Sequence, residues 1–167
     1  MPTLISREEA LSRIVAEGSQ PPCLMCAVLA GRVGDLHVVH EDAGHVVMLP
    51  RYVRCWGHVL VVPRAHVVSF TEIDEPAWAA IYRLAHRAAR MVEALRAPRR
   101  VYVTSTGSAT RELVQTSRHT HVHVIPVYSE DDRPADVFSW VEGVYVGDAA
   151  EWAALRSEYA RWWREAP

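Results

Sequence analysis

Short apolar runs separated by glycine-containing breaks occur along much of the chain, a pattern typical of β-strands. The first two runs are residues 36–39 and 46–49, and His58–Pro63 is apolar on both faces, as expected of a central strand. Two further runs follow at 101–103 and 119–127. The pattern therefore predicts a mainly antiparallel sheet.

Three segments instead have the period of an amphipathic helix. Ser6 can cap a short first helix that Gly18 closes. From Thr71 to Ala97, apolar side chains recur on one face and arginines on the other, and Pro98 ends the pattern. A last helix is expected over Ala149–Glu165. The predicted fold class is therefore α+β: an antiparallel sheet with one long helix packed on it, plus N- and C-terminal helices.

Length and composition narrow the class of protein. The chain has 167 residues, 50% of them apolar, which is enough for a single domain over 1–167. The net charge of −2 gives no general attraction to nucleic acid or to a membrane, and neither is expected as a partner. No apolar stretch is long enough to span a bilayer, and no signal peptide is recognised. Three cysteines, an odd number, do not suit a disulfide framework, so a cytoplasmic protein is expected.

Three histidines alternate with other residues at His119, His121 and His123. Alternate residues of a strand share a face, so we expect the three imidazoles on one side of the strand. Such a row is costly unless each ring has a partner. Metal ligation uses such a row, and so does nucleophilic or acid–base chemistry on phosphate. The alternative is an exposed polar face of an edge strand.

Residues 119–125 resemble the signature of the histidine triad (HIT) superfamily. Just before them, Gln-Thr-Ser-Arg at 115–118 is similar to the stretch that precedes that signature. Trp56–His66 resembles the family's Gly-His-x-Leu-Val-Ile-Pro-x-x-His segment, and Cys-Leu-Met-Cys at 23–26 lies where zinc-containing members have Cys-x-x-Cys. The matches follow the family order over about residues 22–128, with a helical extension at about 148–165. The resemblance implies a HIT-like fold and a homodimer.

The resemblance also implies a mechanism. His121 would attack the α-phosphorus of a nucleotide and form a covalent nucleotidyl-histidine. His123, Gln115 and Thr116 would donate hydrogen bonds to the phosphate, and His58 would lie near the nucleotide. For Gln115 and Thr116 the alternative is an ordinary polar loop, and for His58 a strand-end histidine with a satisfied hydrogen bond.

The expected function is that of a nucleotide hydrolase or nucleotidyltransferase. Its substrate would be a phosphoramidate, a mixed anhydride or a dinucleoside polyphosphate. Two alternatives stay open: phosphorylase-type transfer to inorganic phosphate or another acceptor, and a zinc-stabilised nucleotide-binding protein without turnover.

By the same resemblance a structural zinc ion has four ligands: Cys23, Cys26, His66 and His119. Two thiolates and two imidazoles are a set that zinc prefers, and a closed site leaves no position for water. The alternative is that both cysteines are small core residues and that His66 lies near a helix cap. No catalytic metal is expected, because imidazoles and neutral donors can stabilise the transition state. Cys55 is expected to be a buried thiol.

The chain departs from the family pattern near the ribose site. Many members have an acidic residue eight positions before the histidine that matches His58, where this chain has Pro50. Thr120 interrupts the first apolar spacer of the signature. Additional cations that could bind phosphate are Arg111, Arg118 and Arg133. The histidines that match no motif, and are expected on the surface or in packing, are His37, His40, His45 and His86.

Overall fold

The structure is a computed structural model that describes residues 1–17, 23–106 and 117–166. In chain order its elements are β1 (Thr3–Ile5), α1 (Arg7–Glu17), α2 (Leu24–Leu29), β2 (His37–Glu41), β3 (His45–Leu49), β4 (Val59–Pro63), the 3-10 turn η1 (Phe70–Glu72), α3 (Glu75–Arg96), β5 (Arg100–Thr104), β6 (Val122–Val127), α4 (Pro134–Ser139), β7 (Val144–Val146) and α5 (Ala149–Glu165). None of the helices in these ranges is both long and apolar enough to cross a membrane.

Five strands form the main sheet, in the order β2-β3-β4-β6-β5, and every neighbouring pair is antiparallel. All five residues of the central strand β4 are buried, as its two-sided apolar pattern predicts. A small second sheet pairs β1 with β7. The predicted α+β class with an antiparallel sheet is therefore confirmed.

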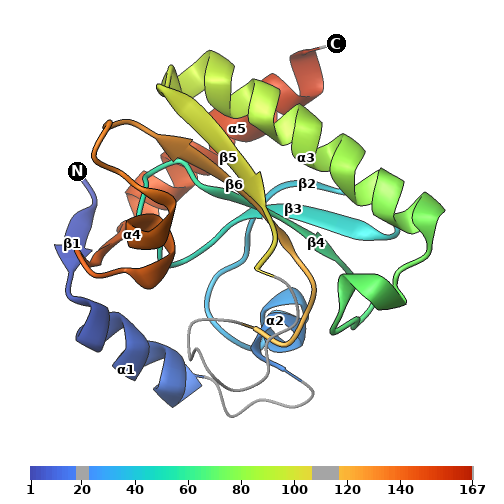
Figure 1. Ribbon diagram of the computed structural model, residues 1–167, viewed down its shortest axis with the longest axis horizontal. Helices are drawn as coiled ribbons and strands as arrows, with labels where there is room; N and C mark the ends of the chain where they lie inside the picture. Colours follow the sequence, from blue (N-terminus) through green and yellow to red (C-terminus); the bar gives the residue numbers. More distant parts are fainter. Residues whose placement is uncertain (18–22, 107–116, 167) are drawn as a thin grey trace.

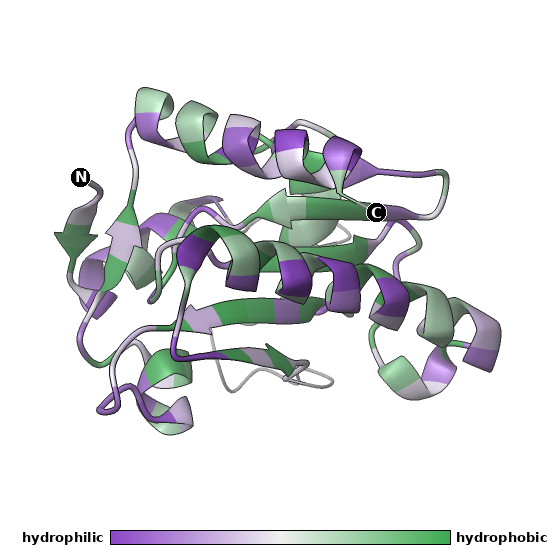
Figure 2. Cartoon of the chain, turned by 90° about the horizontal axis from the view of Figure 1, so that it is seen from above, coloured by the Kyte–Doolittle hydropathy of each residue, from purple (hydrophilic) through white to green (hydrophobic). Residues whose placement is uncertain are grey.

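The helices divide between the two faces of the main sheet (Figure 1). On one face, α3 and α5 pack against Val47, Val61 and Val124. On the other face, the short helix α2 packs against Met48 and Leu60. Figure 2 shows the central strands in green between helices that also carry purple, hydrophilic residues. The helix α4, which is also six residues long, packs on Ile125 of this second face, so short helices cover it.

The helix ends follow from capping. Asp74 caps α3 by accepting from the Ala77 N–H at 2.8 Å, so the helix begins four residues later than the periodicity predicts. α5 has the predicted bounds and starts with a capping box between Asp148 and Glu151. Ser6 accepts from the backbone of α1 as predicted, while Gly18 lies outside the described residues.

One local prediction was wrong. The strand expected over 119–127 begins only at Val122. Before it, the Thr120 N–H donates to the Val67 carbonyl at 2.7 Å, which takes this stretch out of the ladder with β4. The row of three imidazoles on one strand face is therefore not formed, and only His123 lies in the strand.

Candidate active site and metal centre

Two cysteines and two histidines that are distant in sequence come together beside α2. Cys23 and Cys26 come from the start of α2, His66 follows β4, and His119 precedes β6. One ligand atom of each lies within 4.8 Å of all the others. These four residues, called the Cys/His cluster below, are the four that the family resemblance assigns to zinc.

The spacing of the Cys/His cluster fits a tetrahedral cation. The Cys23 Sγ lies 3.5 Å from the His66 Nδ1 and 3.7 Å from the His119 Nδ1, and the Cys26 Sγ lies 3.3 and 3.4 Å from the same two atoms. For zinc bonds of about 2.3 Å to sulfur and about 2.05 Å to nitrogen, a tetrahedron has sulfur–nitrogen edges of about 3.6 Å. The residues present therefore fit a zinc ion.

The protonation state of the thiols is also relevant to cation binding by the Cys/His cluster. Burial, together with the neighbouring Cys23 thiol, raises the pKa of Cys26 to about 11. A thiol with that pKa keeps its proton near neutral pH, and a bound cation is what would displace it. The Nε2 of His119 is 2.8 Å from the Pro63 carbonyl, to which it donates, and this turns Nδ1 towards the two sulfur atoms.

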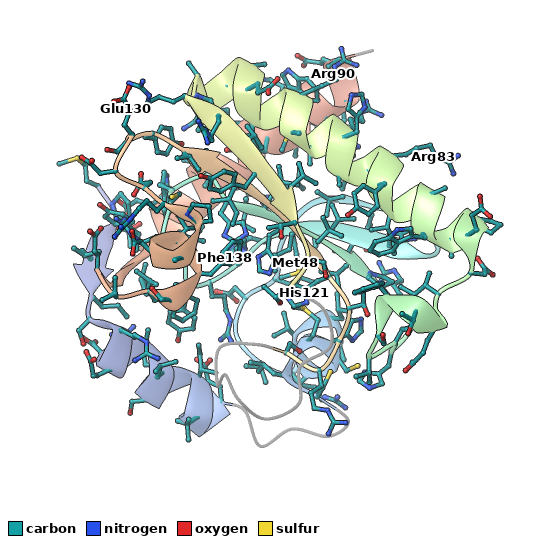
Figure 3. All side chains as sticks on the ribbon, viewed as in Figure 1. Met48, Arg83, Arg90, His121, Glu130 and Phe138 are labelled. Atoms are coloured by element: carbon teal, nitrogen blue, oxygen red, sulfur yellow. The ribbon has the colours of Figure 1, made fainter. Side chains whose placement is uncertain are left out.

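The ring of His121 bonds a backbone carbonyl through Nδ1, whereas that of His119 does so through Nε2. The His121 Nδ1 lies 2.6 Å from the carbonyl oxygen of His119, and the side chain is 8% exposed. A carbonyl only accepts, so the proton of a neutral ring sits on Nδ1. The Nε2 lone pair is then free to act as a nucleophile. In Figure 3, His121 lies near the middle of the molecule, whereas Arg83 and Arg90 project outward from α3.

His123 and His58 form a hydrogen-bonded pair beside His121. His123 is aligned with Leu60 across β4 and β6, and His58 lies two residues before Leu60, on the same face. The His58 Nε2 is 3.0 Å from the His123 Nδ1, and the His121 and His123 rings are 4.7 Å apart between centroids. If His58 donates, the proton of neutral His123 lies on Nε2, where it can be donated to a ligand.

Burial keeps these three rings, called the imidazole trio below, in the neutral form. It lowers the pKa of His58 to about 3, and the nearby His121 adds to the shift. It also lowers the pKa of His121, against the effect of the His119 carbonyl, and takes the pKa of His123 well below its usual value. A neutral imidazole is the form that can attack phosphorus.

Three of the other predicted residues are outside the described part of the chain: Gln115, Thr116 and Arg111. Arg118 is exposed, and the exposed Arg133 bonds Asp136 at 2.8 Å. Cys55 is a buried thiol, as expected. The unmatched histidines are on the surface or in packing, as expected: His37 stacks on Trp152, His40 stacks on Trp163, His45 contacts Asp42 and His86 is exposed.

Two contacts of the site were missed from the sequence. One is the Pro63 carbonyl, a backbone group that no side-chain pattern reveals. The other is Phe138 in α4, whose ring meets the His123 ring edge-on at 6.0 Å between centroids. α4 is a six-residue helix, too short for a helical period to appear in the sequence.

Comparison with known families decides the identity. The HIT domain model matches residues 32–130, more than half of the chain. The chain belongs to the HIT family. An uncharacterized HIT-like protein of Mycobacterium tuberculosis is 30% identical over 110 residues, which are 66% of this chain and 74% of that relative. The HIT match leaves out Cys23 and Cys26 on one side and α4, β7 and α5 on the other.

Solved HIT structures share the fold. A hypothetical histidine triad nucleotide-binding protein from Sulfolobus tokodaii has a TM-score of 0.67 at 22% identity, and the match covers 83% of this chain and 90% of that one. A Zn-bound histidine triad family protein from Mycobacterium smegmatis has a TM-score of 0.64 at 22% identity, with 84% and 94% covered. The HIT-like fold is thus confirmed.

Proposed function

We propose that this HIT protein is a nucleotide hydrolase or nucleotidyltransferase that acts at the α-phosphorus through a covalent adduct on His121. The observation that carries the proposal is the 2.6 Å contact from the His121 Nδ1 to the His119 carbonyl. It fixes the tautomer before substrate arrives, and the buried ring stays neutral. The name of the Sulfolobus relative, a nucleotide-binding protein, agrees with the substrate class.

The reaction has two displacements. The His121 Nε2 forms a bond to phosphorus as the bond to the leaving group breaks, and the leaving group takes the electron pair and then a proton. Water or another acceptor then attacks phosphorus, loses its proton, and the phosphorus–nitrogen bond returns its electrons to Nε2. His123 donates from Nε2 to a phosphate oxygen as negative charge develops. Gln115 and Thr116 stay predictions as further donors.

A zinc ion in the Cys/His cluster would have a structural role. Cys23, Cys26, His66 and His119 would fill its four positions, so the ion would hold α2 and the His119 segment together rather than bind substrate. The Zn-bound relative from Mycobacterium smegmatis supports this choice of metal. The homodimer and the cytoplasmic location expected by resemblance stay predictions, and sedimentation of the purified protein tests the first.

A substrate panel in ¹⁸O-labelled water tests the proposed reaction. Adenylyl and guanylyl phosphoramidates, mixed anhydrides and dinucleoside polyphosphates are supplied with and without inorganic phosphate, and products are identified by mass. Attack at the α-phosphorus puts the label in the nucleoside monophosphate. Transfer to phosphate instead gives unlabelled nucleoside diphosphate. Label only in the leaving group would contradict the proposal, and no turnover of any substrate would favour a binding protein.

A further inference from the structure

The C-terminal helix α5, which lies beyond the HIT match, reaches the turn that carries His58. Tyr159 of α5 is fully buried, and its hydroxyl donates to the Gly57 carbonyl at 3.0 Å. Burial raises the pKa of Tyr159, so the phenol keeps the proton that it donates. The guanidinium of Arg96 lies over the Tyr159 ring at 5.6 Å and pairs with Glu158, the residue before Tyr159 in the helix.

The backbone conformation of Gly57 and its lack of a side chain allow this close contact. Its φ of +97° is one that other residues rarely adopt, and a Cβ at this position would lie only 2.6 Å from the Tyr159 hydroxyl oxygen. The preceding carbonyl of the turn, that of Trp56, accepts from the Tyr128 hydroxyl at 2.7 Å. Two phenols from different parts of the fold therefore hold successive carbonyls of one turn.

Two hydrogen bonds hold the peptide group between Gly57 and His58, one at each end. The Gly57 carbonyl and the His58 N–H belong to the same peptide unit, and the His58 N–H donates to the Cys55 carbonyl at 3.2 Å. With both ends held, the plane of that peptide cannot rotate freely. The orientation of this peptide plane sets the direction of the His58 side chain. It therefore sets the position of the His58 Nε2, which lies 3.0 Å from the His123 Nδ1.

We propose that Tyr159 is a positioning residue for the imidazole trio: through the Gly57–His58 peptide it holds His58 as a donor to His123. His123 then keeps its own proton on Nε2, where the proposed transfer needs it. This inference deepens the proposed function and rests on it for its effect on turnover. The geometry of the two rings, however, can be measured without any substrate.

The test is Tyr159→Phe, which removes one oxygen and keeps the ring in the core. We expect the ¹⁵N ring signals of His58 and His123 to shift in the substrate-free protein. Turnover, kcat, should fall about five- to tenfold with little change in KM, the scale of one lost hydrogen bond. The matched control is Trp163→Phe, because Trp163 is also a buried ring of α5 but packs on His40 and Arg87. It should lower Tm and leave both ring signals and kcat unchanged.

A second variant changes Gly57, the residue whose carbonyl accepts the hydrogen bond from Tyr159. Gly57→Ala should shift the same ring signals, and the shift should be smaller in the Tyr159→Phe background, where the close oxygen is gone. Unchanged ring signals in Tyr159→Phe would overturn the inference, as would an equal loss of kcat in Trp163→Phe. If the native protein turns over no nucleotide, the proposed function fails, while the ring signals still decide whether Tyr159 positions His58.

Discussion

His119 and His121 are two residues apart, yet a backbone carbonyl holds each ring by the opposite nitrogen. In His119 the Nε2 donates to Pro63, and the Nδ1 faces the two cysteine sulfurs. In His121 the Nδ1 donates to the His119 carbonyl, and the Nε2 is left free of that bond. The backbone carbonyl, and not the histidine itself, therefore selects which ring nitrogen is available for chemistry.

The regions around these two residues differ as well. The Cys/His cluster includes the exposed His66 and is joined by side chains from three separate segments. The imidazole trio is 8% exposed at His58 and at His121, and it lies against the two central strands. Changes in the first region should therefore act on metal content and stability, and changes in the second on turnover.

The largest expected effect is that of His121→Ala on turnover. Loss of the nucleophile of a serine protease lowers kcat by about 10⁶-fold, and we expect a loss of several orders of magnitude here with zinc content and Tm nearly unchanged. In His119→Ala we expect loss of zinc and a lower Tm, with a much smaller effect on kcat. Steady-state kinetics, metal analysis and thermal melts of both variants make the comparison. Similar, small losses of turnover in the two variants would contradict the division into two regions.

His123→Ala should be the next most damaging to turnover. It removes one of several donors to the phosphate, a loss of about 3 kcal/mol or roughly 100-fold in kcat by comparison with an oxyanion-hole donor. The nucleophile stays in place, so the covalent adduct should still form, only more slowly. Single-turnover kinetics measure this. A loss as large as that of His121→Ala would mean that the two roles are assigned wrongly.

Cys26→Ser should act through the metal. We expect zinc content to fall and Tm to drop by about 10 °C or more, because loss of the ion removes several kcal/mol and a domain of this size loses about 2–4 °C per kcal/mol. The matched control is Cys55→Ala, a change at a buried thiol outside the Cys/His cluster. It should keep zinc. Purified native protein without zinc, with both thiols freely titratable, would refute the metal assignment.

The smallest expected effect concerns pH and His58. Burial lowers the pKa of His58 in the folded state to about 3. Between about pH 3 and about pH 6.5 the unfolded chain therefore binds one more proton at this residue than the folded protein does. This part of the stability is complete above about pH 6.5 and is lost as the pH falls. His58→Asn should flatten the pH dependence of the unfolding free energy by up to about 1.4 kcal/mol per pH unit.

Urea unfolding from pH 6.5 down to 5 measures that slope. Native and His58→Asn proteins keep the same four metal ligands, so any acid-induced loss of metal enters both slopes. The exposed His86, replaced by Asn, is the matched control and should change the slope less. Equal slopes in the native protein and His58→Asn would show that His58 is not held neutral by burial.

The long helix α5 could be predicted from the sequence because its burial repeats, and its bounds agree with expectation. The strand β4 could be predicted because it is an unbroken apolar run, and all five of its residues are buried. The short elements α2, α4, β1 and β7 span three to six residues, too few for a period to appear. Whether 1–167 is a single domain stays a prediction.

The site residues could be named from the resemblance, but their arrangement could not be predicted. Alternation predicts three imidazoles on one strand face, whereas the hydrogen bond from Thr120 to Val67 diverts His119 to the Cys/His cluster. That bond joins residues distant in sequence and leaves no trace in a local pattern. For the same reason nothing in the sequence links Tyr159 to Gly57, which are 102 residues apart.

Trapping of the covalent adduct shows directly whether His121 carries the nucleotide during turnover. Native protein is mixed briefly with α-labelled substrate, quenched without acid, digested and sequenced by mass spectrometry. We expect an acid-labile, alkali-stable nucleotidyl adduct on the peptide that contains His121, and no adduct in His121→Ala. An adduct on another residue, or near-normal turnover by His121→Ala on a substrate that the native protein uses, would show that His121 is not the nucleophile.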